Sequence, residues 1–351
     1  MRSKEFCHVK VSGLACAVPD NIVSTDAYVD FYGVESVEKF KKATGVKSRF
    51  LSDGTQTASD LCFVAANSLL KKKGLEGTDI DAVVLVTQTP DYAIPSTAYV
   101  LHKRLGVKKD CLVFDINLGC SAFVEGVYVI AGLIESKTIS KALLLVGDSN
   151  TNRQKTENTS FTMMFGDAGS ATLLEYTDEN ISVRGMIRSD GAGFNTLITP
   201  LPGYRFPGQL ACGGNGQQMD NADVFLFAIT QVPKLFKEFF SEYNCTVDSF
   251  DYCILHQANL MIVNQVAKKI KFSPEKVPIS LDRYGNTDGA SIPIGIADLC
   301  ETLTQRRKLK LIMSGFGIGL SWGVLSFEID SDDVLPVIKT NDFFAEGKDV
   351  L

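Results

Sequence analysis

The chain has 351 residues, more than one compact core usually contains, so we expect two similar subdomains or one large composite fold. Hydrophobic residues make up 45% of the sequence and charged residues 22%, a balance that excludes a disordered or fibrous chain. The net charge of -6 argues against sequence-independent binding to a phosphate backbone, so nucleic acid is not expected as a partner.

The cysteine content and the apolar runs bear on the compartment. The nine cysteines include no C-x-x-C pair and are scattered along the chain, which is typical of a reducing compartment. No stretch reaches the ~18 apolar residues that a membrane-spanning helix requires. The apolar stretch 11–18 is too short for a secretion signal. We therefore expect a cytoplasmic protein without a membrane partner.

Short apolar runs alternate with helix-length segments, which predicts an α/β fold whose buried strands are covered by helices on both faces. Three of these runs recur later in the chain in the same order. The matching pairs are 81–86 with 251–256, 141–147 with 309–315, and 166–175 with 317–326. Chance similarity between apolar strands is the alternative, but three matches in register favour a duplication.

The duplication predicts an N-terminal half at 1–177, a C-terminal half at 178–330 and a tail or docking strap at 331–351. Two segments interrupt the repeated pattern. The polar excursion 148–165 has almost no counterpart in the second half and is a candidate for subunit contact or substrate cover. The segment 191–221 is dense in Gly and Pro, which predicts a long surface loop or lid.

Cys120 is the candidate nucleophile. It follows the strand-like run 112–118 and precedes the segment 122–134, which is apolar almost all round and so predicts a buried helix. At a helix N-terminus, unpaired backbone N–H groups and the helix dipole lower the pKa of a thiol below its free value of about 8.5 and make the sulfur nucleophilic. A cysteine that is merely packed is the alternative, and we assign that role to the other eight.

His256 and Asn286 are the candidate partners of Cys120. The sequence has only three histidines, so no metal site built on imidazole is expected. His256 ends the apolar run 252–255, and α/β folds assemble their sites at the carboxyl ends of buried strands. Asn286 would add a neutral hydrogen-bond donor beside it. The alternatives are a structural histidine and an ordinary tight turn at 283–289.

The segment 314–323 carries alternate glycines in a strand-ending turn. Glycines at these positions bring the backbone close to a neighbour and would supply a second N–H group to an oxyanion. The G-x-G-x-G pattern leads into a strand rather than a helix, so it is not a dinucleotide-binding motif.

Cys120, His256 and Asn286, in this order across a duplicated α/β chain, resemble the beta-ketoacyl-ACP synthase III family of thiolase-fold condensing enzymes. The resemblance spans about 9–329. It is carried by Cys120, His256-Gln257-Ala258-Asn259-Leu260, Arg283-Tyr284-Gly285-Asn286-Thr287, Phe165-Gly166-Asp167-Ala168-Gly169, Thr44-Gly45-Val46, Ile94-Pro95-Ser96 and the closing segment 316–323.

This resemblance implies a thiolase-like, duplicated, five-layered αβαβα fold, a homodimer and decarboxylative Claisen condensation, with no metal and no bound cofactor. The implied substrates are acyl-CoA or acyl-ACP and malonyl-ACP, so an acyl carrier protein is an expected partner. Cys120 would take the acyl group, and the backbone N–H groups of Cys120 and Ile318 would hold the oxyanion. His256 and Asn286 would bind the malonyl thioester carbonyl and stabilise the enolate formed as carbon dioxide leaves.

Further residues are implied as substrate contacts. Ile94 matches a position that in the family reaches across the dimer to cap the acyl pocket, and Phe165, Phe316 and Gly317 are expected to bind substrate. Lys268 and Lys269 form a candidate docking patch for an acidic carrier protein. A solvated helix face is the alternative for the two lysines.

The chain departs from the family pattern where coenzyme A binds. The adenine-clamping Trp and Arg of the family fall at Lys39 and Thr159, and the Arg that precedes the Thr-Gly pair is Ala43. The carrier-docking Arg after the H-Q-A-N motif is Met261. These departures favour a carrier-bound or unusual acyl donor and a specialised pathway.

Competing functions make different demands on the chain. The same fold could transfer the acyl group to a hydroxyl or amine, and release of carbon dioxide would separate the two reactions. A papain-like Cys/His/Asn hydrolase would not explain the duplication. A degradative thiolase uses a second cysteine near the closing glycine turn, which 314–322 lacks, and a noncatalytic subunit would have lost Cys120 or His256.

Overall fold

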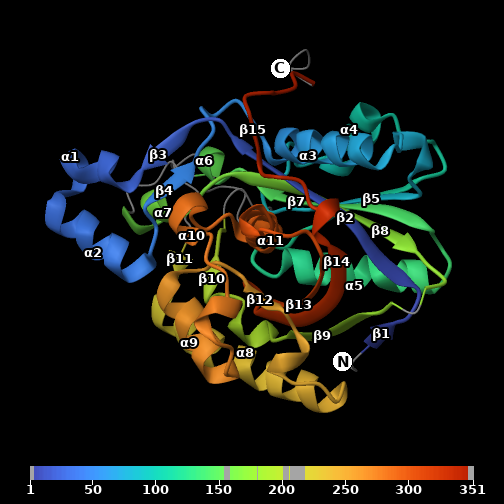
Figure 1. The fold of residues 1–351 in the computed structure, drawn as a ribbon. Helices are drawn as coiled ribbons and strands as arrows, with labels where there is room; N and C mark the ends of the chain where they lie inside the picture. Colours follow the sequence, from blue (N-terminus) through green and yellow to red (C-terminus); the bar gives the residue numbers. More distant parts are fainter. Residues whose placement is uncertain (1–3, 154–158, 180, 201–204, 206–217, 347–351) are drawn as a thin grey trace.

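The computed structural model describes residues 4–153, 159–179, 181–200, 205 and 218–346, and it leaves out the side chains of 152, 153, 159 and 160. These residues form two large mixed sheets and two short two-stranded ones. The large sheets lie face to face with helices between them and outside each (Figure 1). The predicted α/β five-layered αβαβα arrangement is confirmed.

The first large sheet has six strands and the second has five. The first runs, in spatial order, β15 (Ile338–Thr340), β2 (Val9–Pro19), β8 (Ala168–Tyr176), β7 (Lys141–Asp148), β5 (Ala82–Val86) and β6 (Leu112–Ile116). The second runs β1 (Lys4–Phe6), β9 (Val183–Ser189), β14 (Ser321–Asp330), β13 (Lys308–Gly317) and β12 (Tyr252–Leu255). The short sheets pair β3 (Ile22–Ser24) with β4 (Ser48–Phe50) and β10 (Leu197–Ile198) with β11 (Gln218–Met219).

Three apolar cores separate the layers. Helices α5 (Ala122–Glu135) and α11 (Ser291–Thr302) fill the space between the two sheets. Helices α3 (Ala58–Lys73) and α4 (Thr97–Leu105) cover the outside of the first sheet, and α8 (Asn221–Glu242) and α9 (Leu260–Ile270) cover the second. The remaining helices are short or peripheral: α1 (Val29–Tyr32), α2 (Val34–Thr44), α6 (Asn150–Arg153), α7 (Thr159–Met164) and α10 (Leu281–Tyr284).

The two sheets repeat one topology. Strands β8, β7 and β5 lie in the same order and relative directions as β14, β13 and β12: an antiparallel pair followed by a parallel one. Asp81 and Asp251 occupy equivalent places at the starts of the parallel pairs, where their backbone N–H groups donate to Lys141 at 2.8 Å and to Lys310 at 2.9 Å. The proposed division at 177/178 falls between β8 and β9.

Helix α3 shows how local sequence positions a layer. Thr57 and Asp60 form a capping box at its N-terminus, which satisfies backbone N–H groups that a helix start otherwise leaves unpaired. Its C-terminus carries three lysines in the last turn and ends at Gly74 with a φ of 65°. The buried face of α3 packs against β2, β7 and β8.

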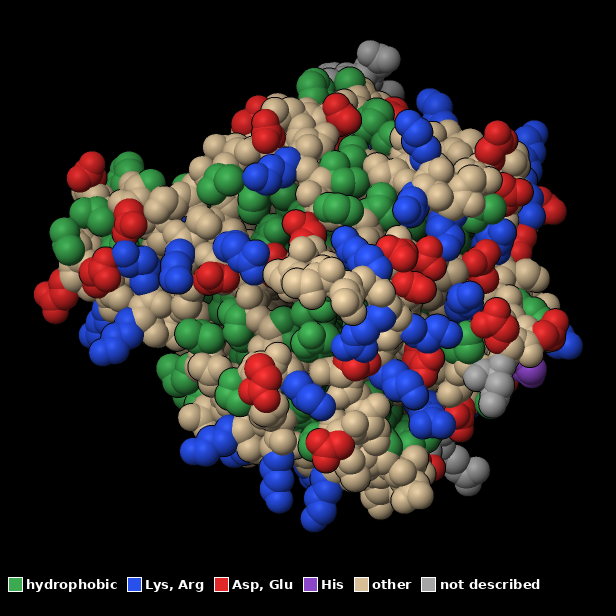
Figure 2. Space-filling view, in the orientation of Figure 1, with side chains coloured by type: hydrophobic (Ala, Val, Ile, Leu, Met, Phe, Trp, Pro, Cys, Tyr) green, Lys and Arg blue, Asp and Glu red, His purple; other side chains and the backbone are tan. Residues whose placement is uncertain are grey.

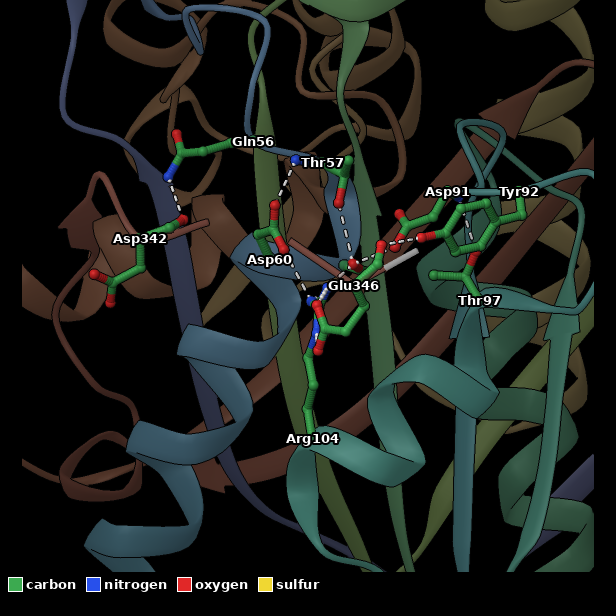
Figure 3. Close-up of polar contacts among 10 residues, drawn as sticks. Gln56, Thr57, Asp60, Asp91, Tyr92, Thr97, Arg104, Asp342 and Glu346 are labelled. Carbon is green, nitrogen blue, oxygen red and sulfur yellow. Dashed lines mark hydrogen bonds and ion pairs between the residues drawn. The ribbon is translucent and has the colours of Figure 1, made fainter. Parts of the chain in front are cut away.

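The segment after residue 330 docks as a strap along the first sheet. Strand β15 pairs in parallel with β2, and the Gln56 amide donates to the carbonyl oxygens of Thr340 and Asp342. Glu346 then receives both Nε and an Nη of Arg104 at 2.8 Å, and Tyr92 Oη donates to its carbonyl (Figure 3). This part of the expected tail is therefore an ordered strap.

Acidic and basic side chains are interspersed over the face shown in Figure 2 rather than gathered by sign. In the part of the chain that the structure describes, no helix is long and apolar enough to cross a membrane.

Candidate active site

A cavity of about 690 Å³ opens beside the carboxyl ends of the central strands. Cys120, His256 and Asn286 all line it, although they come from three distant parts of the chain. Most of its other described lining residues are apolar and belong to α2, α7, the β10–β11 hairpin, α8, α9 and the closing turn. Among them are Phe40, Phe161, Met163, Met164, Phe165, Leu197, Met219, Phe225, Phe227, Ile262, Phe316, Ile318 and Leu320.

Cys120 sits in the turn between β6 and α5, two residues before the helix begins at Ala122. The closing turn passes directly against it. A Cβ atom at Gly317 would lie 2.5 Å from Cys120 Cβ and 2.9 Å from its Sγ, far inside van der Waals contact. Gly317 is therefore required for this close approach, as the alternate glycines indicated.

The prediction that Cys120 has a lowered pKa is wrong for the structure described. Burial raises the pKa of the Cys120 thiol, and the Asp288 carboxylate beside it acts in the same direction. Cys120 Sγ lies 3.3 Å from Asp288 Oδ1 and donates its hydrogen bond there. The helix dipole is outweighed because the thiol is out of water and faces a negative charge, both of which disfavour the thiolate.

His256 follows β12 and is 1% exposed. Its Nδ1 lies 2.7 Å from Ser291 Oγ, a contact that fixes the orientation of the ring. Its ring also meets the ring of Phe316 edge-on. Burial lowers the pKa of His256 to about 3, although a backbone hydrogen bond to Asp288 opposes the shift, so the ring is neutral at physiological pH.

Asn286 lies in the turn between α10 and the short helix at Asp288–Ala290. Its backbone N–H donates to Met164 and its carbonyl accepts from Gly166, both at 3.0 Å, which ties this turn to the end of the 148–165 excursion. Its side-chain Oδ1 accepts the backbone N–H of Asp288 at 2.9 Å. The amide NH₂ of Asn286 is thereby left for a ligand.

The other predicted substrate contacts divide into two groups. Phe165, Phe316, Gly317 and Ile318 all line the cavity. Ile94 does not: its residue is 84% exposed and it lies outside the cavity of its own chain. A residue that reaches into a partner's pocket would be exposed when a single chain is considered by itself. The role of Ile94 across a dimer therefore stays a prediction.

The positions where the chain departs from the family pattern cluster at the same cavity. Lys39, Ala43 and Met261 all line it, whereas the side chain of Thr159 lies outside the described residues. Lys268 and Lys269 are exposed on α9, and Lys269 Nζ donates to the carbonyl of Ile229 on α8 at 2.8 Å. The structure thus gives Lys269 a structural contact and leaves the docking role of both untested.

Two predicted interruptions contribute to the cavity wall. The excursion 148–165 supplies Phe161, Met163 and Met164, which supports substrate cover as one of its roles. The Gly- and Pro-rich segment 191–221 supplies Leu197 and Met219 from its two ends, while most of its centre lies outside the described residues.

Sequence reasoning missed Asp288 and Ser291. Both lie just after Asn286, and both contact a predicted site residue. The sequence places Asp288 only within the turn 283–289. The available signal was an acidic residue two positions after Asn286, but nothing in the sequence places it against a cysteine 168 residues away. In the described part of the chain, no three His, Cys, Asp or Glu side chains gather as a metal site.

Comparison with known proteins identifies the family. Profiles described as 3-oxoacyl-(acyl-carrier-protein (ACP)) synthase III and its C-terminal part match residues 114–191 and 240–329. The beta-ketoacyl-(acyl-carrier-protein) synthase III of Clostridium perfringens strain ATCC 13124 is 33% identical over 322 residues, which cover 90% of this chain and 98% of that protein. The Streptococcus gordonii protein of the same name is 33% identical over 319 residues, with the same shares covered.

Among solved structures, the 3-oxoacyl-(acyl-carrier protein) synthase from Burkholderia xenovorans LB400 superposes with a TM-score of 0.90 at 32% identity, covering 97% of this chain and 99% of that chain. The solved structure therefore shares the fold of this chain over nearly its whole length. The chain therefore belongs to the 3-oxoacyl-ACP synthase III family and is a thiolase-fold condensing enzyme of that type.

Proposed function

We propose that Cys120, His256 and Asn286 carry out the condensation in two half-reactions within the one cavity. The observation that carries this assignment is their common place on its wall, with the neutral His256 ring and the free Asn286 amide beside the thiol. In the first half-reaction the Cys120 sulfur attacks an acyl thioester. The backbone N–H groups of Cys120 and Ile318 hold the oxyanion.

In the second half-reaction, His256 and Asn286 donate hydrogen bonds to the carbonyl oxygen of a malonyl thioester. Loss of carbon dioxide leaves an enolate whose charge these two donors stabilise, and the enolate carbon attacks the acyl-cysteine. Neutral donors suit this step because they favour charge that appears only as the bond to the carboxyl group breaks. The products are a 3-oxoacyl thioester and the regenerated thiol.

We propose that the acyl donor is carried by a protein rather than by coenzyme A. The phosphates of coenzyme A need cationic partners, yet Lys39 is the one Lys or Arg among the described residues that line the cavity. The apolar walls accept the pantetheine arm that both donors share, and they do not discriminate between them. Such a preference supports a role in a specialised pathway.

We further propose that the enzyme is a homodimer. Ile94 is a large apolar side chain with 84% of its surface exposed. It lies in the same loop as Tyr92, which contacts Glu346 of the strap. In a dimer this side chain would cap the partner's acyl pocket, so each pocket would be completed by both chains.

Intact-mass analysis of the wild type and Cys120→Ala, exposed to matched acyl-CoA and acyl-carrier thioesters, tests these assignments. We expect an adduct that digestion maps to Cys120, formed faster from the carrier than from coenzyme A. An adduct on another residue would remove Cys120 from its role. A faster reaction with coenzyme A would contradict the carrier preference alone.

A further inference from the structure

The turn after Asn286 places a carboxylate on the nucleophile. Asp288 is buried, with 2% of its surface exposed, and its Oδ1 lies 3.3 Å from Cys120 Sγ. No other side chain is within hydrogen-bond distance of this sulfur among the contacts that the described residues make. This carboxylate is therefore in place to accept the proton of the nucleophile.

The local backbone is built to hold this contact. Asp288 has a φ of 52°, a left-handed conformation that Asp and Asn adopt more readily than most residues. The Asn286 side chain holds its N–H at 2.9 Å. The nucleophile's own turn leaves room for the carboxylate, since a Cβ at Gly119 would lie 2.7 Å from Asp288 Oδ1.

The remaining candidate for a base is His256, and its environment does not suit that task. Its Nδ1 is occupied by Ser291, and its pKa of about 3 makes the neutral ring a weak proton acceptor. The proposed function also needs His256 as a hydrogen-bond donor to the malonyl carbonyl. The acyl-transfer step therefore requires another group to receive the thiol proton, which the Cys120 sulfur directs at Asp288 Oδ1 in the resting site.

We propose that the Asp288 carboxylate is the general base that removes the Cys120 thiol proton during acyl transfer and returns it to the departing thiol. The proposal rests on the proposed acyl-cysteine intermediate and deepens it. Asp288 is a catalytic residue in this scheme because it touches a reacting atom.

The step balances without a further reactant. As Cys120 Sγ forms its bond to the acyl carbon, its proton passes to Asp288 Oδ1, and the carbonyl electron pair moves onto the oxygen held by the backbone N–H groups. Collapse of this intermediate breaks the bond to the donor sulfur. The departing pantetheine thiolate takes the proton from Asp288, which restores the carboxylate and leaves acyl-Cys120.

Asp288→Asn tests the proposal, because asparagine keeps the size, tolerates the positive φ and cannot accept the proton. Single-turnover acylation from an acyl-pantetheine thioester is followed by intact mass between pH 6 and 8, and alkylation of Cys120 by iodoacetamide is measured in parallel. General bases contribute about 10²- to 10⁴-fold, so we expect acylation at pH 7 to fall at least ~100-fold. Alkylation should still occur in the variant, which shows that the Cys120 thiol remains accessible.

The pH dependence of the acylation rate distinguishes a general-base role of Asp288 from a positioning role. Because the thiol proton passes to Asp288 rather than to solvent, the wild-type acylation rate should change little with pH. In Asp288→Asn the thiol must ionise first, and the rate should rise about tenfold per pH unit. The urea unfolding midpoint of Asp288→Asn, measured beside that of the wild type, shows whether the variant is folded.

Asp148→Asn is the matched control. Asp148 is a buried aspartate whose charge also raises the pKa of Cys120, but its Oδ1 accepts from Thr87, Gln88 and Thr89 rather than from the thiol. It carries the same charge change without the contact, so its acylation should keep the flat profile of the wild type. A tenfold rise per pH unit in this control as well would show that charge alone sets the profile and would overturn the proposal.

Two results with Asp288→Asn would also overturn the proposal. Acylation as fast as wild type or faster would show that the carboxylate only suppresses the thiolate, and slow acylation with a flat pH profile would show that Asp288 only positions the turn. If the wild type forms no adduct although iodoacetamide alkylates Cys120, the acyl-cysteine step itself fails. That outcome differs from a defect confined to the variant.

Discussion

Ser291 Oγ lies 2.7 Å from His256 Nδ1 and fixes the imidazole ring at the end of β12. The same oxygen is 3.4 Å from the backbone N–H of Gln257, so it also links the ring to the chain that follows it. Ser291, the first residue of α11, thus orients His256, which follows β12.

Ser291→Ala should slow decarboxylation of a malonyl thioester about tenfold, because the ring loses the partner that fixes its orientation in the cavity wall. Self-acylation of Cys120 should be unchanged, since Ser291 does not contact the sulfur. Release of carbon dioxide and intact mass measure the two steps separately. Ser291→Thr keeps the hydroxyl and should retain most of the activity, and equal loss in both variants would contradict the orienting role.

Gly317→Ala should abolish acylation of Cys120. The added Cβ would lie 2.5 Å from Cys120 Cβ, so either the thiol or the closing turn must move away from its place. Gly191→Ala is the control, because a Cβ there meets nothing within 4 Å. Acylation at the wild-type rate in Gly317→Ala would show that the turn yields without cost.

The fold could be predicted because the same series of apolar, strand-like runs occurs twice in the sequence. The runs that became β5, β7 and β8 recur as β12, β13 and β14, and three matches in one order are far more specific than one apolar strand. Cys120 and His256 could be predicted for a related reason: each ends a strand-like run, and strand ends in α/β folds share one edge.

The remaining features depend on contacts between distant residues. The carboxylate of Asp288 reaches Cys120 because of a positive φ and the approach of two turns, neither of which has a periodic sequence signal. Burial of the thiol, together with that contact, reversed the predicted direction of the Cys120 pKa shift. The docking of the strap could not be predicted either, because it depends on Gln56, Tyr92 and Arg104, which lie far from the strap in the sequence.

The lowered pKa of His256 makes the stability of the fold depend on pH in one direction. An unfolded histidine takes up a proton below about pH 6.5, whereas the buried ring stays neutral down to about pH 3. Between these values the unfolded state binds more protons, so the free energy of unfolding falls as the pH falls. The loss between pH 6.5 and 5 should be about 2 kcal/mol from this residue.

Urea unfolding at pH 7 and pH 5, followed by the fluorescence of Trp322, checks this difference. Trp322 is the one tryptophan in the sequence and packs edge-on against Phe227. His256→Gln has no titrating ring and should lose about 2 kcal/mol less than the wild type over this interval. An equal loss in both proteins would show that the His256 ring takes up a proton in the folded state near its ordinary pKa.

The carrier-docking assignment predicts a difference between two donors. Lys268→Glu should raise KM for a carrier-bound thioester severalfold and leave KM for the corresponding free pantetheine thioester unchanged, because only the former presents an acidic protein surface. Lys308→Glu makes the same charge change at an exposed residue of β13 away from α9 and should affect neither KM. Equal changes in KM for the carrier-bound thioester in the two variants would show that Lys268 and Lys269 belong to a solvated helix face rather than to a docking patch.

The strap should contribute to stability mainly through Arg104. The side chain of Arg104 is 5% exposed, donates at 2.9 Å to Asp60, which is 1% exposed, and lies 4.5 Å over the ring of Phe344. Arg104→Ala leaves Asp60 buried without its cation and should lower the free energy of unfolding by about 3 kcal/mol or more. Glu346→Gln keeps the Arg104–Asp60 pair and should cost about 1 kcal/mol.

Thermal and urea unfolding of the two variants measure this order, and Arg184→Ala supplies the control. Arg184 pairs with Glu5 at the surface, where both side chains are more than a third exposed, and such a pair contributes at most about 1 kcal/mol. If Arg104→Ala destabilises no more than Arg184→Ala does, the strap is held by β15 and the Gln56 amide rather than by the buried charge. If Glu346→Gln lowers the free energy of unfolding as much as Arg104→Ala does, the bidentate contact between Arg104 and Glu346 is the main interaction. The buried Arg104–Asp60 pair then adds little stability of its own, which contradicts the predicted order.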